Sequence, residues 1–321
     1  LNLGTLSTSA IFGVLTYLII GYLNFDFGVF YATVAGSLVG VLVGITTDYY
    51  TSVEKAAVKD TARASVTGAA INILSGFSYG LMSIVPPVIG ISIATIVAYY
   101  FAGIYGIAMA AVGMLSIVGM VVSADAYGPI VDNAKGIAEQ SGMLKEVVEV
   151  TDDLDVVGNT AKAVTKGFAI GAAALTVLAL FHAYAEIVDI EVIDMMNPYV
   201  VVGVVIGATI PPVISAMLIS GVSKNAFRMV EEVRRQFREI PGLIDGKSRP
   251  DYARCVDVAA AGALRELALP SVLSIISPLV VGLVLGKEAL GGFLGGSIVT
   301  GIIFALFMAN SGGIWDNAKK Y

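Results

Sequence analysis

Two short motifs in this chain have the residue types needed to bind a metal ion and phosphate. Residues 132–135 read Asp-Asn-Ala-Lys, and residues 316–319 repeat the same four residues. Each copy stands where a long apolar stretch ends. Carboxylates and ammonium groups gathered at one face of a membrane are suited to holding a metal-bound phosphate. The two motifs therefore predict phosphate chemistry at a membrane surface.

The spacing of the charged residues places them on common helix faces. Asp125 and Asp132 are two helical turns apart, and Asp316 stands at i relative to Lys319 and Lys320 at i+3 and i+4. Carboxylate and amide oxygens are the ligands that Mg²⁺ prefers, so we expect Mg²⁺ as cofactor. The expected metal ligands are Asp125, Asp132, Asn159 and Asp316, and the lysines expected to neutralise phosphate oxygens are Lys162, Lys166, Lys319 and Lys320.

Other site chemistries are disfavoured by what the sequence contains. A zinc site is disfavoured because zinc is usually bound by several Cys and His ligands, and the sequence has one of each. The phosphate-binding loop G-x-x-x-x-G-K-[ST] does not occur, which disfavours a simple ATPase. A net charge of −6 without a basic tract speaks against nucleic acid as a partner.

Composition places the chain in a membrane. Of its 321 residues, 57% are hydrophobic and only 14% are charged. This composition is typical of an all-α polytopic membrane protein. Apolar stretches long enough to cross the bilayer predict about eight helices near 5–23, 28–50, 66–101, 104–140, 155–185, 198–238, 252–285 and 289–321.

Several of these helices are longer than a bilayer requires. A crossing needs roughly 20 residues, so the longer stretches are expected to extend into the cytoplasm. Proline within them, at Pro86-Pro87, Pro211-Pro212, Pro270 and Pro278, predicts kinks.

The basic residues predict the orientation. If the segments 51–65, 141–154 and 224–251 share one side, that side holds every Lys and Arg except Lys287. By the positive-inside rule it is the cytoplasmic side. We therefore expect an integral membrane protein whose site faces the cytoplasm, in the cell membrane of a prokaryote or an acidic-compartment membrane of a eukaryote.

Counting along the predicted helices places three polar groups at one level. Asp132 lies 28 residues from Ile104, Asn159 lies 26 from Ala185, and Asp316 lies 27 from Ala289. At about 1.5 Å per residue, this level is about 40 Å from the outer surface and roughly 10 Å beyond the hydrocarbon. The site is expected to be wet and mounted on membrane-spanning helices.

Simpler interpretations apply to some of the charged residues. Charges at the end of a membrane helix are often solvated, and Asp152, Asp153 and Asp155 are interpreted as a solvated loop and helix N-cap. Trp315 is interpreted as an interfacial anchor. Asn310 and Glu266 are expected to form hydrogen bonds or ion pairs between helices.

Three longer segments resemble the signatures of a known family. Residues 125–134 read DAYGPIVDNA, residues 158–171 read GNTAKAVTKGFAIG, and residues 313–321 read GIWDNAKKY. They resemble, in this order, segments of membrane-integral, ion-translocating inorganic pyrophosphatases. The resemblance runs over essentially the whole chain and would correspond to the eighth to fifteenth of that family's sixteen helices. It implies a homodimeric pump that hydrolyses Mg²⁺-pyrophosphate on the cytoplasmic side and moves a cation outward.

The resemblance also implies roles for individual residues. It makes Asp132, Asn159 and Asp316 part of the metal and substrate cage, with Asp125 near it. Lys319, Lys320 and Lys166 would contact pyrophosphate. Lys162 stands where potassium-independent, proton-pumping members of the family carry Lys and potassium-activated members carry Ala.

Parts of the family pattern are not found in this sequence. Segments similar to D-V-G-A-D-L-V-G-K-V-E and D-P-F-K-D-T, which supply the water-activating carboxylates and the ionic gate, do not occur. We therefore expect residues 1–321 to be one transmembrane helical domain of a longer chain, without the full site. The paired motifs also predict duplicated helix units near 28–185 and 198–321.

Three functions stay open at this point. The first is pyrophosphate hydrolysis coupled to outward H⁺ transport, which Lys162 favours. The second is the same hydrolysis coupled to Na⁺ transport, because the selecting gate carboxylate is expected outside these residues. The third is a secondary transporter that binds a solute and hydrolyses nothing.

Overall fold

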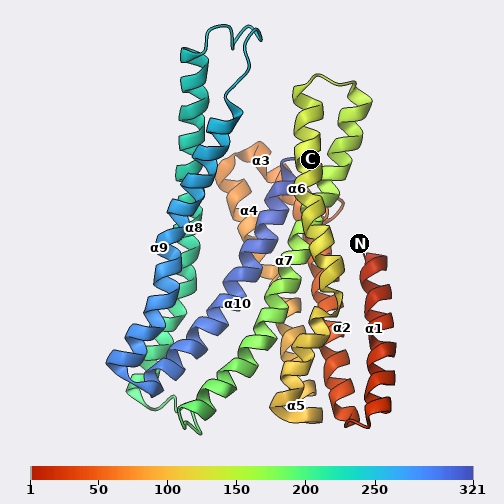
Figure 1. The fold of residues 1–321 in the computed structure, drawn as a ribbon, viewed down its shortest axis with the longest axis vertical. Coiled ribbons are helices and arrows are strands. Elements are labelled where there is room, and N and C mark those ends of the chain that lie inside the picture. Colours follow the sequence, from red (N-terminus) through yellow and green to blue (C-terminus); the bar gives the residue numbers. More distant parts are fainter. Residues whose placement is uncertain (1, 321) are drawn as a thin grey trace. The chain divides into compact units, whose positions relative to one another are not determined.

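The structure is a computed structural model that describes residues 2–320. Within that range every regular element is helical, which confirms the predicted all-α membrane fold. The elements are α1 (Asn2–Leu23), α2 (Phe27–Thr51), α3 (Ala56–Thr67), α4 (Ala69–Met82), α5 (Val85–Met114), a 3₁₀ turn (Leu115–Ile117), α6 (Val118–Gln140), α7 (Lys145–Ile187), α8 (Pro198–Glu239), α9 (Tyr252–Leu285) and α10 (Lys287–Ala318) (Figure 1).

Seven helical runs in the described residues are long and apolar enough to cross a membrane. The run Ala69–Gln140 is 72 residues long, far more than the roughly 20 that one crossing needs. Its chain reverses inside α5 at Ala102 and Gly103, and Gly103 takes a φ of +59° that L side chains rarely adopt. This run therefore holds two of the eight predicted crossings, and the reversal lies where 66–101 was expected to meet 104–140.

Some predicted boundaries were wrong because helices continue beyond the apolar stretches. The segment 51–65 was expected as a loop but contains most of α3, whose helix ends at Gly68 with a φ of +134°. The helix expected to start at 155 starts at Lys145. Pro86 and Pro87 lie in the first turn of α5. The backbone nitrogens of the first turn have no partner within the helix, so proline costs no hydrogen bond there. These two prolines therefore start a helix and do not kink one.

The chain forms two compact units. Unit 1 comprises residues 1–187 and 302–321, and unit 2 comprises residues 188–301, so α10 begins in unit 2 and ends in unit 1. These limits differ from the predicted duplicated segments 28–185 and 198–321, whose symmetry stays a prediction.

The core of unit 1 lies between α2, α5 and α7. Val43, Met114 and Leu175 are fully buried there, and Phe168 is nearly so. Helix α6 runs antiparallel beside α7 (Figure 1). Helix α7 packs against both α5 and α6, so its polar N-terminal half lies beside α6.

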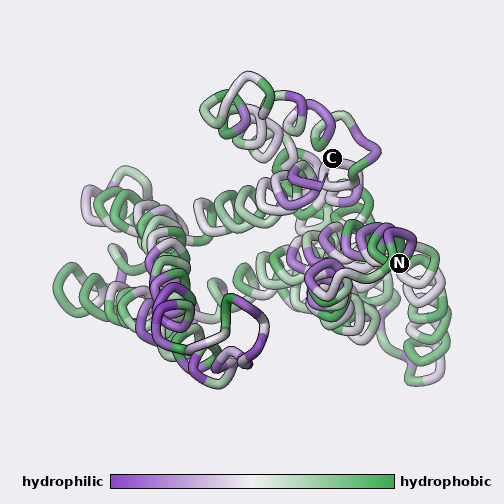
Figure 2. Tube along the Cα trace, turned by 90° about the horizontal axis from the view of Figure 1, so that it is seen from above, coloured by the Kyte–Doolittle hydropathy of each residue, from purple (hydrophilic) through white to green (hydrophobic). Residues whose placement is uncertain are grey.

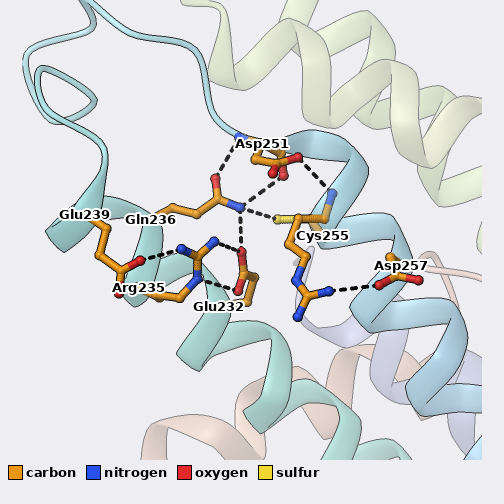
Figure 3. Close-up of polar contacts among 8 residues, drawn as sticks. Glu232, Arg235, Gln236, Glu239, Asp251, Cys255 and Asp257 are labelled. Atoms are coloured by element: carbon orange, nitrogen blue, oxygen red, sulfur yellow. Dashed lines mark hydrogen bonds and ion pairs between the residues drawn. The ribbon is translucent and has the colours of Figure 1, made fainter.

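Unit 2 is built on the antiparallel pair α8 and α9. Figure 2 shows hydrophilic colour in the loop that joins them and mainly hydrophobic colour along the helices. A polar network ties the loop end together: Gln236 donates to the Asp251 carbonyl (3.0 Å) and accepts from its N–H (2.8 Å) (Figure 3). Asp251 also caps α9 by accepting from the Arg254 N–H. This hairpin is therefore closed by specific hydrogen bonds as well as by apolar contact.

Candidate functional site

The C-terminal parts of α6 and α10 meet the N-terminal half of α7, which brings the predicted site segments together. The Lys162 Nζ of α7 lies 3.2 Å from the Asp132 Oδ2 of α6 and donates to it. The Asn317 amide of α10 donates to the Thr160 hydroxyl of α7 at 3.1 Å. Helical counting therefore placed Asp132, Asn159 and Asp316 correctly relative to one another.

The predicted shared face of Asp125 and Asp132 is confirmed. Asp125 accepts a 3.0 Å hydrogen bond from the Thr165 hydroxyl, and Asp132 accepts from Lys162. Both partners stand on α7, one turn apart. The stem of Lys162 crosses Gly128 of α6 so closely that a Cβ at that position would lie 2.5 Å from its Cε. Glycine at 128 thus lets the lysine reach Asp132.

The ammonium group of Lys162 is held by two oxygen atoms. Its Nζ lies 3.2 Å from the Asp132 carboxylate and 3.2 Å from the Asn159 amide oxygen. A carboxylate and an amide oxygen are also suitable ligands for a hard monovalent or divalent cation. The lysine side chain is 19% exposed, so its charge lies within the cluster and not in bulk solvent.

The end of α10 is anchored by Asn317. This side chain is fully buried and also donates to the Thr51 carbonyl of α2 at 2.7 Å. Its anchoring fixes the neighbouring Asp316, which pairs with Lys319 at 2.6 Å. The hydrogen bond from Lys319 to Asp316 raises the pKa of this lysine above its usual value. Lys319 therefore remains charged at neutral pH.

Lys320 forms an ion pair with Asp155, which the sequence analysis did not assign to the site. It pairs with Asp155, which is completely buried, and lies 3.9 Å from Asp152. Asp152 also pairs with Lys135 of α6. The interpretation of Asp152 and Asp155 as a solvated loop and N-cap was wrong, because α7 begins ten residues earlier and carries both on its inner face.

Lys166 and Lys319 line two separate cavities of unit 1. Lys166 is exposed and borders a cavity of about 210 Å³ between α6 and α7, together with Asp125 and Thr165. Lys319 borders a groove of about 970 Å³ between α3, α4 and the end of α10. Arg63 lines the same groove, which gives it a second cation.

Trp315 is a packing residue. Its indole lies against Gly76 of α4 and its Nε1 donates to the Asn72 carbonyl at 3.3 Å. Its role as an interfacial anchor stays a prediction. Asn310, by contrast, makes the predicted interhelical bond, donating to the Ser83 hydroxyl at 2.9 Å.

We call these charged residues the α6–α7–α10 cluster. It contains five carboxylates and five lysines and is balanced in charge. Its members are Asp125, Asp132, Asp152, Asp155, Asp316, Lys135, Lys162, Lys166, Lys319 and Lys320. Four of the five lysines, all but Lys166, pair with a carboxylate of the cluster.

The donor types of the cluster fit Mg²⁺, although its carboxylates are paired with ammonium groups. Within residues 2–320, no group of three His, Cys, Asp or Glu side chains lies close enough together to hold a metal. Two buried oxygens, Asp155 Oδ1 and Asn317 Oδ1, nevertheless have no hydrogen-bond partner among the described residues. Desolvated oxygens of this kind are costly unless a cation or donor reaches them. Metal binding here would require lysines to release carboxylates.

The sequence contained signals for the residues that the prediction missed. Asp155 stands one turn before Asn159 and two turns before Lys162, and so on the same face of α7. Lys135 closes the first Asp-Asn-Ala-Lys motif. No such signal exists for Thr51 or Arg63, which the tertiary fold brings to α10.

Comparison with known proteins places the chain in one family. The family model described as "Inorganic H+ pyrophosphatase" matches residues 1–321. A K(+)-insensitive pyrophosphate-energized proton pump of Methanosarcina mazei is 49% identical over 314 residues, covering 95% of this chain and 47% of that protein.

Further relatives are named as pumps of different ions, either protons or sodium. A K(+)-insensitive pyrophosphate-energized proton pump of Caldanaerobacter subterraneus is 45% identical, covering 90% of this chain and 44% of that protein. A K(+)-stimulated pyrophosphate-energized sodium pump of Thermotoga maritima is 42% identical, covering 93% and 43% respectively. The chain thus spans about half the length of the curated relatives that it matches.

Proposed function

Because the chain belongs to the inorganic H⁺ pyrophosphatase family, we propose that its α6–α7–α10 cluster is one wall of a site that hydrolyses pyrophosphate at the cytoplasmic face and drives H⁺ outward. The observation that supports this most is the convergence of the Asp-Asn-Ala-Lys motifs and the Asn159 segment on one charge-balanced cluster. The proposal includes an integral membrane pump and a homodimer.

The lysines of the cluster can bind the phosphate oxygens of pyrophosphate if they release their present carboxylate partners. Lys319, just after the end of α10, is 62% exposed and pairs with Asp316 one turn earlier. Exposed pairs of this kind contribute little stability, so Lys319 can exchange its carboxylate for a phosphate oxygen at small cost. We also assign Lys166, which is exposed, and Lys320 to contact with pyrophosphate, although Lys320 is only 10% exposed and would have to leave buried Asp155 to do so.

Asp132 and Asp316, once released by Lys162 and Lys319, would hold Mg²⁺ together with the Asn159 amide oxygen and with Asp125, which accepts from Thr165. The metal would polarise phosphoryl oxygens and neutralise their charge. The residues of this chain would orient pyrophosphate for in-line attack by water and stabilise charge on the leaving phosphate. The carboxylates that take the proton from the attacking water are expected in the remainder of the longer protein.

Lys162 supports the choice of H⁺ and independence from K⁺. Its ammonium lies between the same carboxylate and amide oxygens that would coordinate a K⁺ ion. A tethered charge at this place makes an added K⁺ unnecessary. The relatives include both proton and sodium pumps, so Na⁺ transport is the second candidate.

The test is phosphate release and ion transport by the full-length protein in inverted membrane vesicles. We expect Mg²⁺-dependent release of phosphate from pyrophosphate without K⁺, together with acidification of the vesicle interior. Asp132→Ala and Asp316→Ala should abolish both, while Asp245→Ala in the α8–α9 loop serves as control. Normal activity of either site variant would refute the assignment of the site.

The other candidates give different results in the same assay. Uptake of Na⁺ without acidification would identify a sodium pump. Transport without any phosphate release would identify a secondary transporter.

The role of Lys162 has its own test. Lys162→Ala should acquire a K⁺ requirement, whereas Lys145→Ala, which removes an exposed lysine of the same helix, should not. Indifference of the Lys162→Ala variant to K⁺ would reject this role.

A further inference from the structure

Unit 2 contains a groove that is apolar at one end and cationic at the other. It lies between α8 and α9 and has a volume of about 770 Å³. We call it the α8–α9 groove. Its lining comprises Val213, Ala216, Met217, Ser220, Lys224, Arg228, Arg265, Glu266, Leu269 and Pro270.

The cationic end of the α8–α9 groove has more positive than negative charge. Three cations, Lys224, Arg228 and Arg265, share a single carboxylate, that of Glu266. The Arg228 Nη2 pairs with the Glu266 Oε1 at 2.5 Å, and the Lys224 Nζ lies 3.7 Å from the Oε2. No ion pair involves Arg265 among residues 2–320. Two positive charges are therefore left to be balanced from outside the groove.

A desolvated donor adds to this imbalance. One guanidinium nitrogen of Arg228, Nη1, is shielded from solvent and has no hydrogen-bond partner among the described residues. A buried charged donor without an acceptor is costly, and a phosphate oxygen is an acceptor that a guanidinium binds well. The geometry therefore favours an anion with several oxygens.

The position along the helices places the cationic end at the edge of the hydrocarbon. Arg265 lies 20 residues before Leu285, where α9 ends. At about 1.5 Å per residue this is about 30 Å, the thickness of the bilayer core. Leu269 and Pro270 stand one turn deeper in the membrane, and Leu269 is 66% exposed. The groove thus presents charge at headgroup level and apolar surface where acyl chains lie.

Ordinary snorkelling of basic side chains accounts for this arrangement only in part. Snorkelling sends single Lys and Arg heads outward to water. Here the cations come from two helices, converge on one carboxylate and line one groove with an apolar floor. Basic pockets between transmembrane helices on the cytoplasmic side are a known way to bind lipid phosphate groups.

We propose that the α8–α9 groove binds the phosphate of an anionic phospholipid of the cytoplasmic leaflet, with an acyl chain along Val213, Met217 and Leu269. Soluble phosphate shares the headgroup chemistry, but it would leave the apolar floor without a partner. The proposal requires that α8 and α9 cross the bilayer with their joining loop on the cytoplasmic side, and it is independent of pyrophosphate hydrolysis.

The test is native mass spectrometry of the full-length protein in detergent, titrated with phosphatidylglycerol or phosphatidylcholine of identical acyl chains. We expect a clear preference for phosphatidylglycerol. The double variant Lys224→Gln/Arg265→Gln should weaken its binding by about 25-fold, since each surface cation contributes about fivefold to binding of an anionic lipid. Lys224 has only a long, exposed pair with Glu266 and Arg265 has no ion pair among residues 2–320, so the variant should fold, which its melting temperature checks.

The matched control is Arg234→Gln/Lys247→Gln, which removes the same charge from the same hairpin outside the groove. It should change phosphatidylglycerol binding less than twofold. Equal losses in both double variants, or no preference over phosphatidylcholine, would overturn the proposal. Displacement of phosphatidylglycerol by millimolar inorganic phosphate would also overturn it, by identifying a soluble-phosphate site.

Discussion

The α6–α7–α10 cluster and the α8–α9 hairpin both carry many ion pairs, but they use different cations. Every cation of the cluster is a lysine, and most of its pairs join different elements, as Lys162 with Asp132, Lys135 with Asp152, and Lys320 with Asp155. The hairpin uses mainly arginines, and most of its pairs lie within one helix, as Arg235 with Glu232 and Glu239 (Figure 3).

This difference has a physical meaning. The arginine guanidinium is a planar fork that fixes a carboxylate in place, and Arg235 binds both oxygens of Glu232 in this way. A lysine ammonium is a point charge that can move from one oxygen to another without losing geometry. The arginine pairs of the hairpin therefore fix its shape, whereas the exposed lysines of the cluster can exchange one oxygen partner for another. Four variants test this contrast.

The largest effect is expected from Asp155→Asn. The change leaves the Lys320 ammonium, whose side chain is only 10% exposed, without its buried partner. Loss of one member of a buried pair costs about 3–5 kcal/mol of unfolding free energy. A strongly lowered melting temperature in detergent is expected. An unchanged melting temperature would mean that Lys320 leaves the site readily and that the buried pair is not structural.

Gly128→Ala should have the next largest effect. The new Cβ overlaps the stem of Lys162 and should displace its ammonium from Asp132 and Asn159. Overpacking typically costs about 1–3 kcal/mol. We expect lower pyrophosphatase activity that K⁺ partly restores, measured by phosphate release. Gly136→Ala, on the same helix with open space around it, is the control. An equal response to K⁺ in both variants would argue against the contact.

Gln236→Met should loosen the hairpin and spare the cluster. The nearly isosteric side chain removes the bonds to both backbone groups of Asp251 and to Glu232. Leaving a buried polar group unsatisfied costs about 1–3 kcal/mol. Hydrogen exchange should rise in residues 240–251 while pyrophosphatase activity stays normal. Loss of activity without faster exchange would show that the hairpin acts on the site directly.

Arg234→Gln should have the smallest effect. Arg234 pairs with Glu231 at 2.9 Å, and both side chains are more than 60% exposed. Exposed pairs one turn apart contribute about 0.3–0.5 kcal/mol. The melting temperature should therefore shift little. A large drop would show that even the exposed pairs of the hairpin act as one network, which would sharpen its contrast with the cluster.

Much of the fold was predictable because it depends on properties that repeat along the sequence. Apolar stretches set the membrane crossings, and helical rise set the common level of Asp132 and Asn159. The helix starts were less predictable: α7 begins at Lys145 in a charged segment that hydropathy does not mark as helical. That one error hid Asp155, because a residue assigned to a loop cannot be assigned to a helix face.

The pairing of the site residues lay beyond the sequence. Spacing shows that Asp316 and Lys319 can meet, but it cannot show that Lys320 turns to Asp155 instead. Nor can it show that Thr51 of α2 receives the Asn317 amide. These contacts depend on the close packing of four helices, which only the folded chain defines. Motif residues were therefore predictable, and their partners were not.

The reversal at Ala102 and Gly103 determines where this chain can be labelled. Two residues join two membrane crossings there, and the glycine conformation excludes most side chains, so an epitope or protease site inserted at that point should prevent the helices from closing. The loop of residues 240–251 is a better site for a tag, because it joins two helices whose ends are fixed by arginine ion pairs. Accessibility of a tag placed there, in intact cells and in inverted vesicles, would report the sidedness of the whole protein directly.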